Sequence, residues 1–183
     1  MPIKVTFEIS DADLKYFRSV MREARKKAKT ADEGTILSAA RQLARRTSEI
    51  QLPGFVTERL DALDTLTRML EDREWNMQGD ARTRVLQALA YFAEPHDLIP
   101  DQIPGLGFLD DAIMVELVVQ ELKPEIEAYD AFCGYRKEQR GKKGITPEVA
   151  DKQLDAQRRS MYARMERRRE QRERRGGSFS IFR

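Results

Sequence analysis

The chain has 183 residues, of which 35% are charged and 40% hydrophobic, a composition that suits one domain of ordinary size or one domain with an appendage. No segment supplies the about 20 consecutive apolar residues of a membrane-spanning helix, so we expect no transmembrane segment. The single cysteine excludes an internal disulfide and, with the single histidine, a Cys/His zinc site within one chain. A lone cysteine also suits a reducing compartment, so we expect a cytoplasmic protein.

The charge is divided unevenly along the sequence. The net charge is only +2, but residues 136–175 hold 15 Lys and Arg against 7 Asp and Glu. The remainder of the chain is therefore acidic, and a basic segment is joined to an acidic body. Basic segments of this kind usually contact an anionic partner.

Residues 3–9 alternate apolar and polar side chains, with Ile3, Val5, Phe7 and Ile9 on one side. This period of two predicts a short, half-buried strand. Ser10 follows as a candidate helix N-cap, with acidic residues in the next turn.

The next four segments carry apolar residues three and four positions apart, the spacing of an amphipathic helix. Helix breakers such as Pro53-Gly54 separate them. We therefore expect helices over residues 11–29, 33–50, 55–74 and 81–93.

Residues 94–107 contain three prolines and two glycines, which exclude a continuous helix. Their apolar side chains predict a loop that packs against the body. A fifth helix is expected from about Phe108, and because it is apolar on most sides it is typical of the central helix of a bundle. Pro124 is expected to kink this helix or to restart it.

A last helix is expected from Thr146-Pro147-Glu148, which supply a capping residue, a first-turn proline and a first-turn acid. Its thin apolar stripe ends at Met165. The run from Glu166 to Arg175 has no apolar face, so it predicts either a solvated helix held by pairs four residues apart or a disordered arm.

These patterns predict a mainly α fold, a multi-helix bundle with a short N-terminal strand and a C-terminal basic helix. The C-terminal tail, with Phe179 and Phe182, could pair with that strand. We expect an N-terminal strand at 1–9, a helical domain at 10–135, a flexible basic linker at 136–146, a basic helical arm at 147–175 and a tail at 176–183.

One segment resembles a known family. Residues 91–119 contain Asp-Leu-Ile-Pro-Asp, then Ile-Pro and a glycine, then Leu-Asp-Asp at the start of a helix. This order and spacing resemble the signature of the YkvA-like bacterial proteins. The resemblance implies a compact helical domain of bacterial type and, because that family has no assigned function, it implies no reaction.

Within this signature, one stretch of fifteen residues contains four carboxylates, and these have two interpretations. Oxygen ligands in such numbers suit Mg²⁺ or Mn²⁺, which could serve an enzyme acting on a phosphate-containing substrate. Alternatively, each carboxylate caps a nearby backbone turn or helix end. The candidate metal ligands are Asp97, Asp101, Asp110 and Asp111.

The arginines of the basic arm form the second candidate site, because arginine suits bidentate contact with phosphate. Few aromatic residues accompany them, so sequence-specific reading of nucleic acid is not expected. The alternative is a solvated helix whose arginines pair with neighbouring glutamates. The candidate anion-binding residues are Arg158, Arg159, Arg164, Arg167, Arg168, Arg169, Arg172, Arg174 and Arg175.

The sequence therefore favours a non-enzymatic bacterial interaction protein without a cofactor. Its helical body would bind a protein partner or a second copy, and its basic arm would contact nucleic acid, an acidic protein or an anionic membrane surface. The alternative is a Mg²⁺- or Mn²⁺-dependent enzyme that uses the four aspartates.

Overall fold

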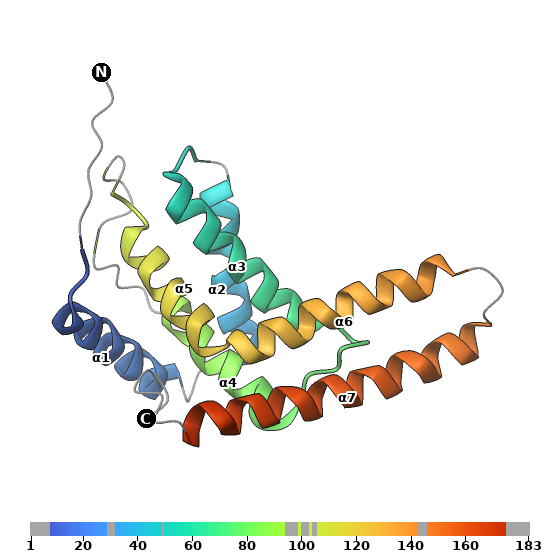
Figure 1. Cartoon of the computed structure of the whole chain (residues 1–183). Helices are drawn as coiled ribbons and strands as arrows, with labels where there is room; N and C mark the ends of the chain where they lie inside the picture. Colours follow the sequence, from blue (N-terminus) through green and yellow to red (C-terminus); the bar gives the residue numbers. More distant parts are fainter. Residues whose placement is uncertain are drawn as a thin grey trace.

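The structure is a computed structural model that describes residues 8–28, 32–48, 50–93, 99, 103, 106–142 and 146–174. Every regular element in these residues is helical, which confirms the expected mainly α, multi-helix fold (Figure 1). The elements are α1 (Asp11–Ala28), α2 (Glu33–Ser48), α3 (Gly54–Glu71), α4 (Gly79–Leu89), the 3₁₀ helix η1 (Ala90–Ala93), α5 (Leu109–Glu121), α6 (Lys123–Gly141) and α7 (Pro147–Arg174).

The helix boundaries follow the sequence pattern within a few residues. The segment expected to be helical to residue 93 is α4 as far as Leu89 and then the 3₁₀ helix η1, and the end of α3 also differs. That helix ends at Glu71, not at the expected residue 74. The reason is a local turn in which the Asp72 carboxylate accepts hydrogen bonds from the backbone N–H groups of Glu74 and Trp75, at 3.0 and 3.1 Å. An aspartate that caps the backbone in this way competes with continuation of the helix.

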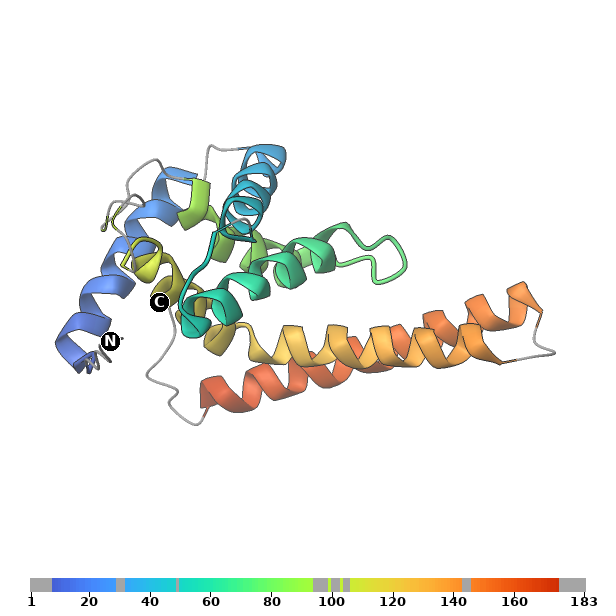
Figure 2. The ribbon, with the colours of Figure 1, turned by 90° about the horizontal axis from the view of Figure 1, so that it is seen from above.

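The helix expected to be central, α5, is buried along most of its length. It lies between α1 and α3 in both views of the ribbon (Figures 1 and 2), and Met114, Val115 and Val118 have no exposed surface. An apolar surface on nearly all sides requires neighbours on nearly all sides, which is why this segment occupies the middle of the body.

The chain turns at Leu122 and continues directly into α6, so Pro124 restarts a helix instead of kinking one. Proline is tolerated in the first turn because its missing N–H would have had no partner within the helix. α6 and α7 then run antiparallel as a long hairpin, whose far end extends beyond the body (Figure 2).

A cluster of aromatic side chains attaches this hairpin to the body. Trp75 follows α3, is fully buried and stacks on Tyr162 of α7, with ring centroids 4.5 Å apart. Phe132 of α6 packs against the same indole at 5.1 Å. Close by, the Asp72 carboxylate accepts hydrogen bonds from Arg136 and from the Tyr129 hydroxyl, at 2.7 and 3.1 Å.

The expected N-terminal strand is not supported. Glu8 and Ile9, the described part of residues 3–9, belong to no strand, and the described residues contain no other strand with which they could pair. Residues 1–7, the tail at 176–183 and residues 143–145 of the expected linker lie outside the described part of the chain.

The basic run after Met165 also differs from both alternatives drawn from the sequence. It is helical as far as Arg174, the last residue described in the run, but it is not simply a solvated helix, because Arg169 is only 8% exposed. Polar partners on other helices, not an apolar stripe, hold this part of α7 in place.

Candidate anion-binding face of α7

The arginines of α7 divide into an inner group and an outer group, according to the side of the helix on which they lie. The inner arginines, Arg169 and Arg172, bond to groups of α5 and α6. The outer arginines have exposed side chains, and of these Arg168 also reaches α6, where it pairs with Glu127. α7 forms an outer edge of the molecule in both ribbon views (Figures 1 and 2), and the outer group is exposed there and open to a partner.

Arg169 is the most buried of the inner group. Its guanidinium donates to Glu125 at 3.0 Å and to Glu121 at 3.2 Å, and both acids are buried. Arg84 of α4 donates to the same Glu125 oxygen at 3.0 Å and to Glu166 of α7 at 2.9 Å. These five residues form a network of charges that joins α4, α5, α6 and α7. Because Arg169 bonds to acids inside this network, it is not available to an outside partner.

Three further arginines of the expected site also have partners within the chain. Arg172 donates to the backbone carbonyl oxygens of Gln120 and Glu121, at 3.1 and 3.5 Å. Arg158 and Arg159 both form ion pairs with Asp155, one turn earlier on α7. For Arg172 these bonds hold the end of α5, so its role is at least partly structural.

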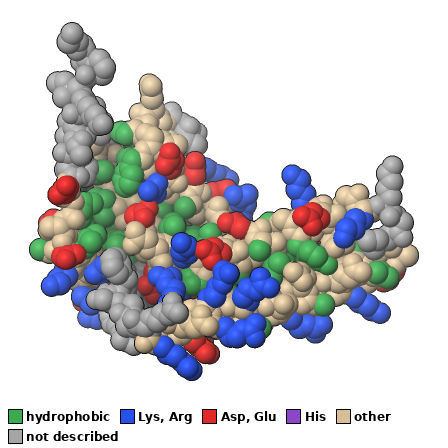
Figure 3. Space-filling view, in the orientation of Figure 1, with side chains coloured by type: hydrophobic (Ala, Val, Ile, Leu, Met, Phe, Trp, Pro, Cys, Tyr) green, Lys and Arg blue, Asp and Glu red, His purple; other side chains and the backbone are tan. Residues whose placement is uncertain are grey.

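The outer group is the stripe formed by Arg164, Arg167, Arg168 and Arg174. Spacings of three, four and seven residues place side chains on one face of a helix, and all four of these residues are exposed. Within the described residues, neither Arg164 nor Arg167 forms a hydrogen bond or an ion pair. Lys and Arg side chains gather over α7 in the space-filling view (Figure 3).

The acids of α7 do not neutralise this stripe. Glu166 pairs with Arg84 and Glu173 with Arg169, so both are directed to the inner network. Glu170 approaches Arg174 at 4.0 Å, a pair that is largely exposed and therefore weak. The stripe, which the residues Arg164, Arg167, Arg168 and Arg174 define, carries surplus positive charge.

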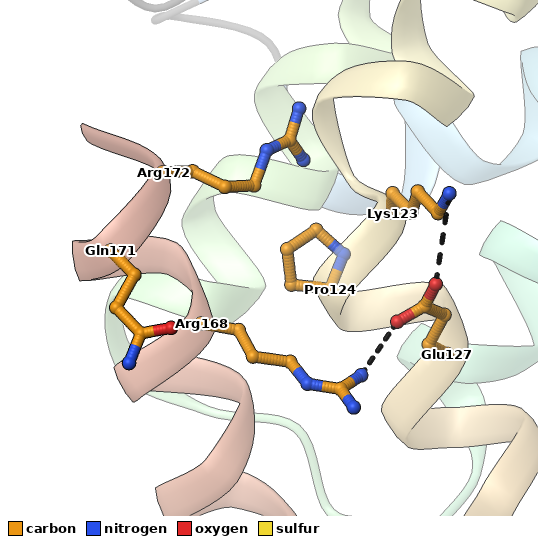
Figure 4. A pocket seen from close by; sticks show the side chains of 6 residues that line it. All are labelled: Lys123, Pro124, Glu127, Arg168, Gln171 and Arg172. Carbon is orange, nitrogen blue, oxygen red and sulfur yellow. Dashed lines mark hydrogen bonds and ion pairs between the residues drawn. The ribbon is translucent and has the colours of Figure 1, made fainter. Parts of the chain in front are cut away.

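A pocket of about 480 Å³ adjoins the stripe, between the start of α6 and the last turns of α7 (Figure 4). Arg168 belongs to both the stripe and the pocket. The Glu127 carboxylate lies between Arg168 and Lys123 and forms ion pairs with both, at 2.6 and 3.9 Å. The lining residues are Lys123, Pro124, Glu127, Arg168, Gln171 and Arg172.

Sequence reasoning found the α7 half of this pocket but missed its α6 half. Lys123 and Glu127 show only an ordinary pairing four residues apart, which is common on exposed helices. The sequence holds no signal that this pair lies opposite Arg168, because that depends on how α6 and α7 are aligned. Arg175, the last candidate of the expected set, lies outside the described residues.

The four candidate metal ligands can be described only in part. Asp110 and Asp111 are buried in the first turn of α5, and the Asp110 carboxylate accepts a hydrogen bond from the Ile99 N–H at 3.0 Å. Asp97 and Asp101 lie outside the described residues. Among the residues that are described, no cluster of three or more Asp, Glu, His or Cys is arranged to hold a metal ion. A site formed by all four aspartates stays a prediction.

Tyr162, the one described aromatic residue of the expected arm, is engaged in the core. Its ring stacks on Trp75 with an angle of 20° between the planes. Burial raises the pKa of its hydroxyl well above the ordinary value. An aromatic ring held in this way offers no face to a nucleic-acid base.

Comparison with known proteins points to one family. A model described as "Protein of unknown function (DUF1232)" matches residues 81–117, which cover nearly all of α4, η1 and most of α5. The "Uncharacterized membrane protein YkvA" of Bacillus subtilis (strain 168) is 35% identical over 76 residues, which are 38% of this chain and 70% of the relative. No solved structure matches the chain.

The stripe and the pocket lie outside the residues that the family model matches. Within the described residues, no helix is both long and apolar enough to cross a membrane.

Proposed function

We propose that this chain, which belongs to the YkvA-like family of proteins of unknown function, binds an anionic phospholipid surface through the arginine stripe of α7. The observation that carries the proposal is the exposure of Arg164, Arg167, Arg168 and Arg174 on one face of α7. Among the described residues, Arg164 and Arg167 have no acidic partner, and the pairs that Arg168 and Arg174 form with glutamates are largely exposed. Each basic residue near an anionic membrane contributes about 1 kcal/mol of binding.

Three observations favour a lipid surface over the other anionic partners that the sequence allows. α7, whose exposed arginines form the stripe, lies on an outer edge of the molecule, where a flat surface can reach it (Figure 1). The only described aromatic ring of the arm, Tyr162, is engaged with Trp75 and gives no platform for stacking bases. The Bacillus subtilis relative is named a membrane protein.

The expected protein partner or second copy, which the helical body would bind, stays a separate prediction, as does the cytoplasmic location. A relative named as a membrane protein gives no support for a purely cytoplasmic protein, but a protein that binds a membrane surface can face the cytoplasm.

The test is co-sedimentation of the whole protein with vesicles of phosphatidylcholine alone and of phosphatidylcholine with phosphatidylglycerol. We expect binding only to the anionic vesicles, with an affinity that falls as salt screens the charges. Arg164→Gln/Arg167→Gln removes two unpaired charges and should weaken binding about 30-fold, equivalent to about 2 kcal/mol.

The matched control is Lys137→Gln/Lys152→Gln, which removes two exposed charges, one from α6 and one from α7, that have no ion-pair partner among the described residues and lie away from the stripe. Equal losses in the two double variants would mean that net charge, not the stripe, governs binding. Tighter binding to RNA or DNA than to the anionic vesicles, with the same dependence on the stripe, would replace the membrane by a nucleic acid as the partner.

A further inference from the structure

The pocket beside the stripe is a separate feature, built from two helices that are distant in the sequence. Lys123 and Glu127 come from the first turns of α6, and Arg168, Gln171 and Arg172 come from the last turns of α7. In the close view these polar side chains surround the ring of Pro124 (Figure 4). Its volume of about 480 Å³ falls within the range of about 300–1,000 Å³ that is typical of ligand pockets.

The charges of the lining suit a doubly negative group. Lys123, Arg168 and Arg172 bring three positive charges and Glu127 one negative charge, so the lining has a surplus of two positive charges. A phosphate monoester carries between about −1.5 and −2 at neutral pH. Its oxygens also match the planar fork of an arginine, which can donate two parallel hydrogen bonds.

Glu127 occupies the place that such an anion would take. Its carboxylate lies between Lys123 and Arg168 and pairs with both, from a side chain that is 44% exposed (Figure 4). An exposed pair of this kind contributes little to stability, so an entering phosphate can replace it without a large loss.

We infer that this pocket binds the phosphate monoester headgroup of an anionic lipid, with Lys123 and Arg168 as the main ligands and Glu127 as a competing internal anion. The inference rests on the proposed function, because Arg168 belongs to both the stripe and the pocket and therefore places the pocket at the same membrane-facing edge. The stripe provides non-specific attraction, and the pocket provides a preference among anionic lipids.

The experiment compares the whole protein on two kinds of vesicle of equal surface charge. One contains phosphatidic acid, which has a monoester headgroup, and the other contains phosphatidylglycerol, which has a diester. We expect a preference for phosphatidic acid, and we expect Glu127→Gln to strengthen binding to phosphatidic acid about fivefold, because the pocket then gains one unit of charge. Lys123→Gln should weaken the same binding about fivefold.

Two controls change the same charges on the same helix away from the pocket. Glu138→Gln matches Glu127→Gln, and Lys137→Gln matches Lys123→Gln, and both positions are exposed. A gain of binding by Glu127→Gln counts for the pocket only if the variant melts at the same temperature as the wild type, because an unfolded basic chain also adheres to anionic vesicles.

The outcomes separate the pocket from the proposed function. If pocket variants and controls shift binding equally while the stripe variant still loses it, the pocket inference is wrong and the proposed function stands. If no vesicle binds, the proposed function fails. Thermal melts in inorganic phosphate, compared with melts in chloride of equal ionic strength, then test whether the phosphate that the pocket binds is a free compound or a lipid headgroup. A rise that Lys123→Gln removes would assign the pocket to a free phosphate compound and overturn the lipid headgroup.

Discussion

Arg169 on α7 places its guanidinium 3.0 Å from the Oε1 atom of Glu125 on α6, a carboxylate that has no exposed surface. The arginine comes from one of the most polar segments of the chain, yet it is buried. The other carboxylate oxygen of Glu125 is buried with no hydrogen-bond partner in the described structure. Arg169 and Arg84 are therefore the groups that compensate this buried charge.

The first prediction concerns the loss of that compensation. Arg169→Met should lower the free energy of unfolding by about 3–5 kcal/mol, because it leaves Glu125 and Glu121 buried beside fewer positive charges. Arg169→Met/Glu125→Leu should recover much of the loss, since the uncompensated charge is then removed as well. Urea denaturation of the three proteins measures both effects. A single variant within about 1 kcal/mol of the wild type would show that the network does not stabilise the docking of α7.

The second prediction separates the ring of Tyr162 from its hydroxyl. The hydroxyl oxygen is buried without a hydrogen-bond partner among the described residues, while the ring stacks on Trp75. Tyr162→Phe should therefore change stability by less than about 0.5 kcal/mol or increase it, because no buried hydroxyl is then left unsatisfied. Tyr162→Ala should cost about 3–5 kcal/mol through the cavity it leaves. Thermal unfolding of the two variants provides the comparison, and a large loss in Tyr162→Phe would reveal a partner for the hydroxyl.

The third prediction is a pH dependence that arises from Asp72. Burial acts to raise the pKa of this carboxyl, but hydrogen bonds from the Trp75 N–H and from Arg136 outweigh it, and the pKa is lowered overall. A lowered pKa means that the folded state favours the ionised form. The resulting stability is present above the ordinary aspartate pKa of about 3.9 and is lost as the pH falls through the lower, folded value.

The measurement for Asp72 is the free energy of unfolding of the wild type and of Asp72→Asn across the acid range. The difference between them should be largest near neutral pH and should shrink below pH of about 4. Asp64→Asn is the control, because Asp64 forms an exposed pair with Arg68 on the same helix and should leave the pH profile unchanged. A constant difference at all pH values would rule out ionisation of Asp72 as the cause.

The fourth prediction tests the metal interpretation of the proline-rich loop. Because the Asp110 carboxylate binds the Ile99 N–H, Asp110→Asn should lower stability by about 1–2 kcal/mol, and by the same amount with and without Mg²⁺ or Mn²⁺. Thermal melts of the wild type, Asp110→Asn and Asp101→Asn, each with and without the ion, measure these effects. A rise in melting temperature that depends on the ion and is lost in both variants would support a metal site and the enzyme alternative.

The positions of most helices and the identity of the central one could be predicted because they depend on local information. The spacing of apolar residues selects a helix and its buried face, and the nearly continuous apolar surface of α5 requires a central position. Glu116, a charged residue of α5, accepts a hydrogen bond from Arg59 of α3, a contact that spacing along one helix does not specify. The N-terminal strand could not be predicted from local information in the same way, because a short alternating segment forms a strand only if another strand pairs with it.

The sequence by itself determined the helical architecture, the acidic body and the basic final segment, because each is a property of composition or of spacing along one helix. Only the tertiary structure decided which arginines of α7 turn inward and which remain exposed. Arg169 is buried because Glu121 and Glu125, more than forty residues away, lie opposite it. Arg167 is exposed because none of the described helices covers its side of α7. Contacts between helices so distant in sequence follow from their alignment in space, which the pattern along one helix does not specify.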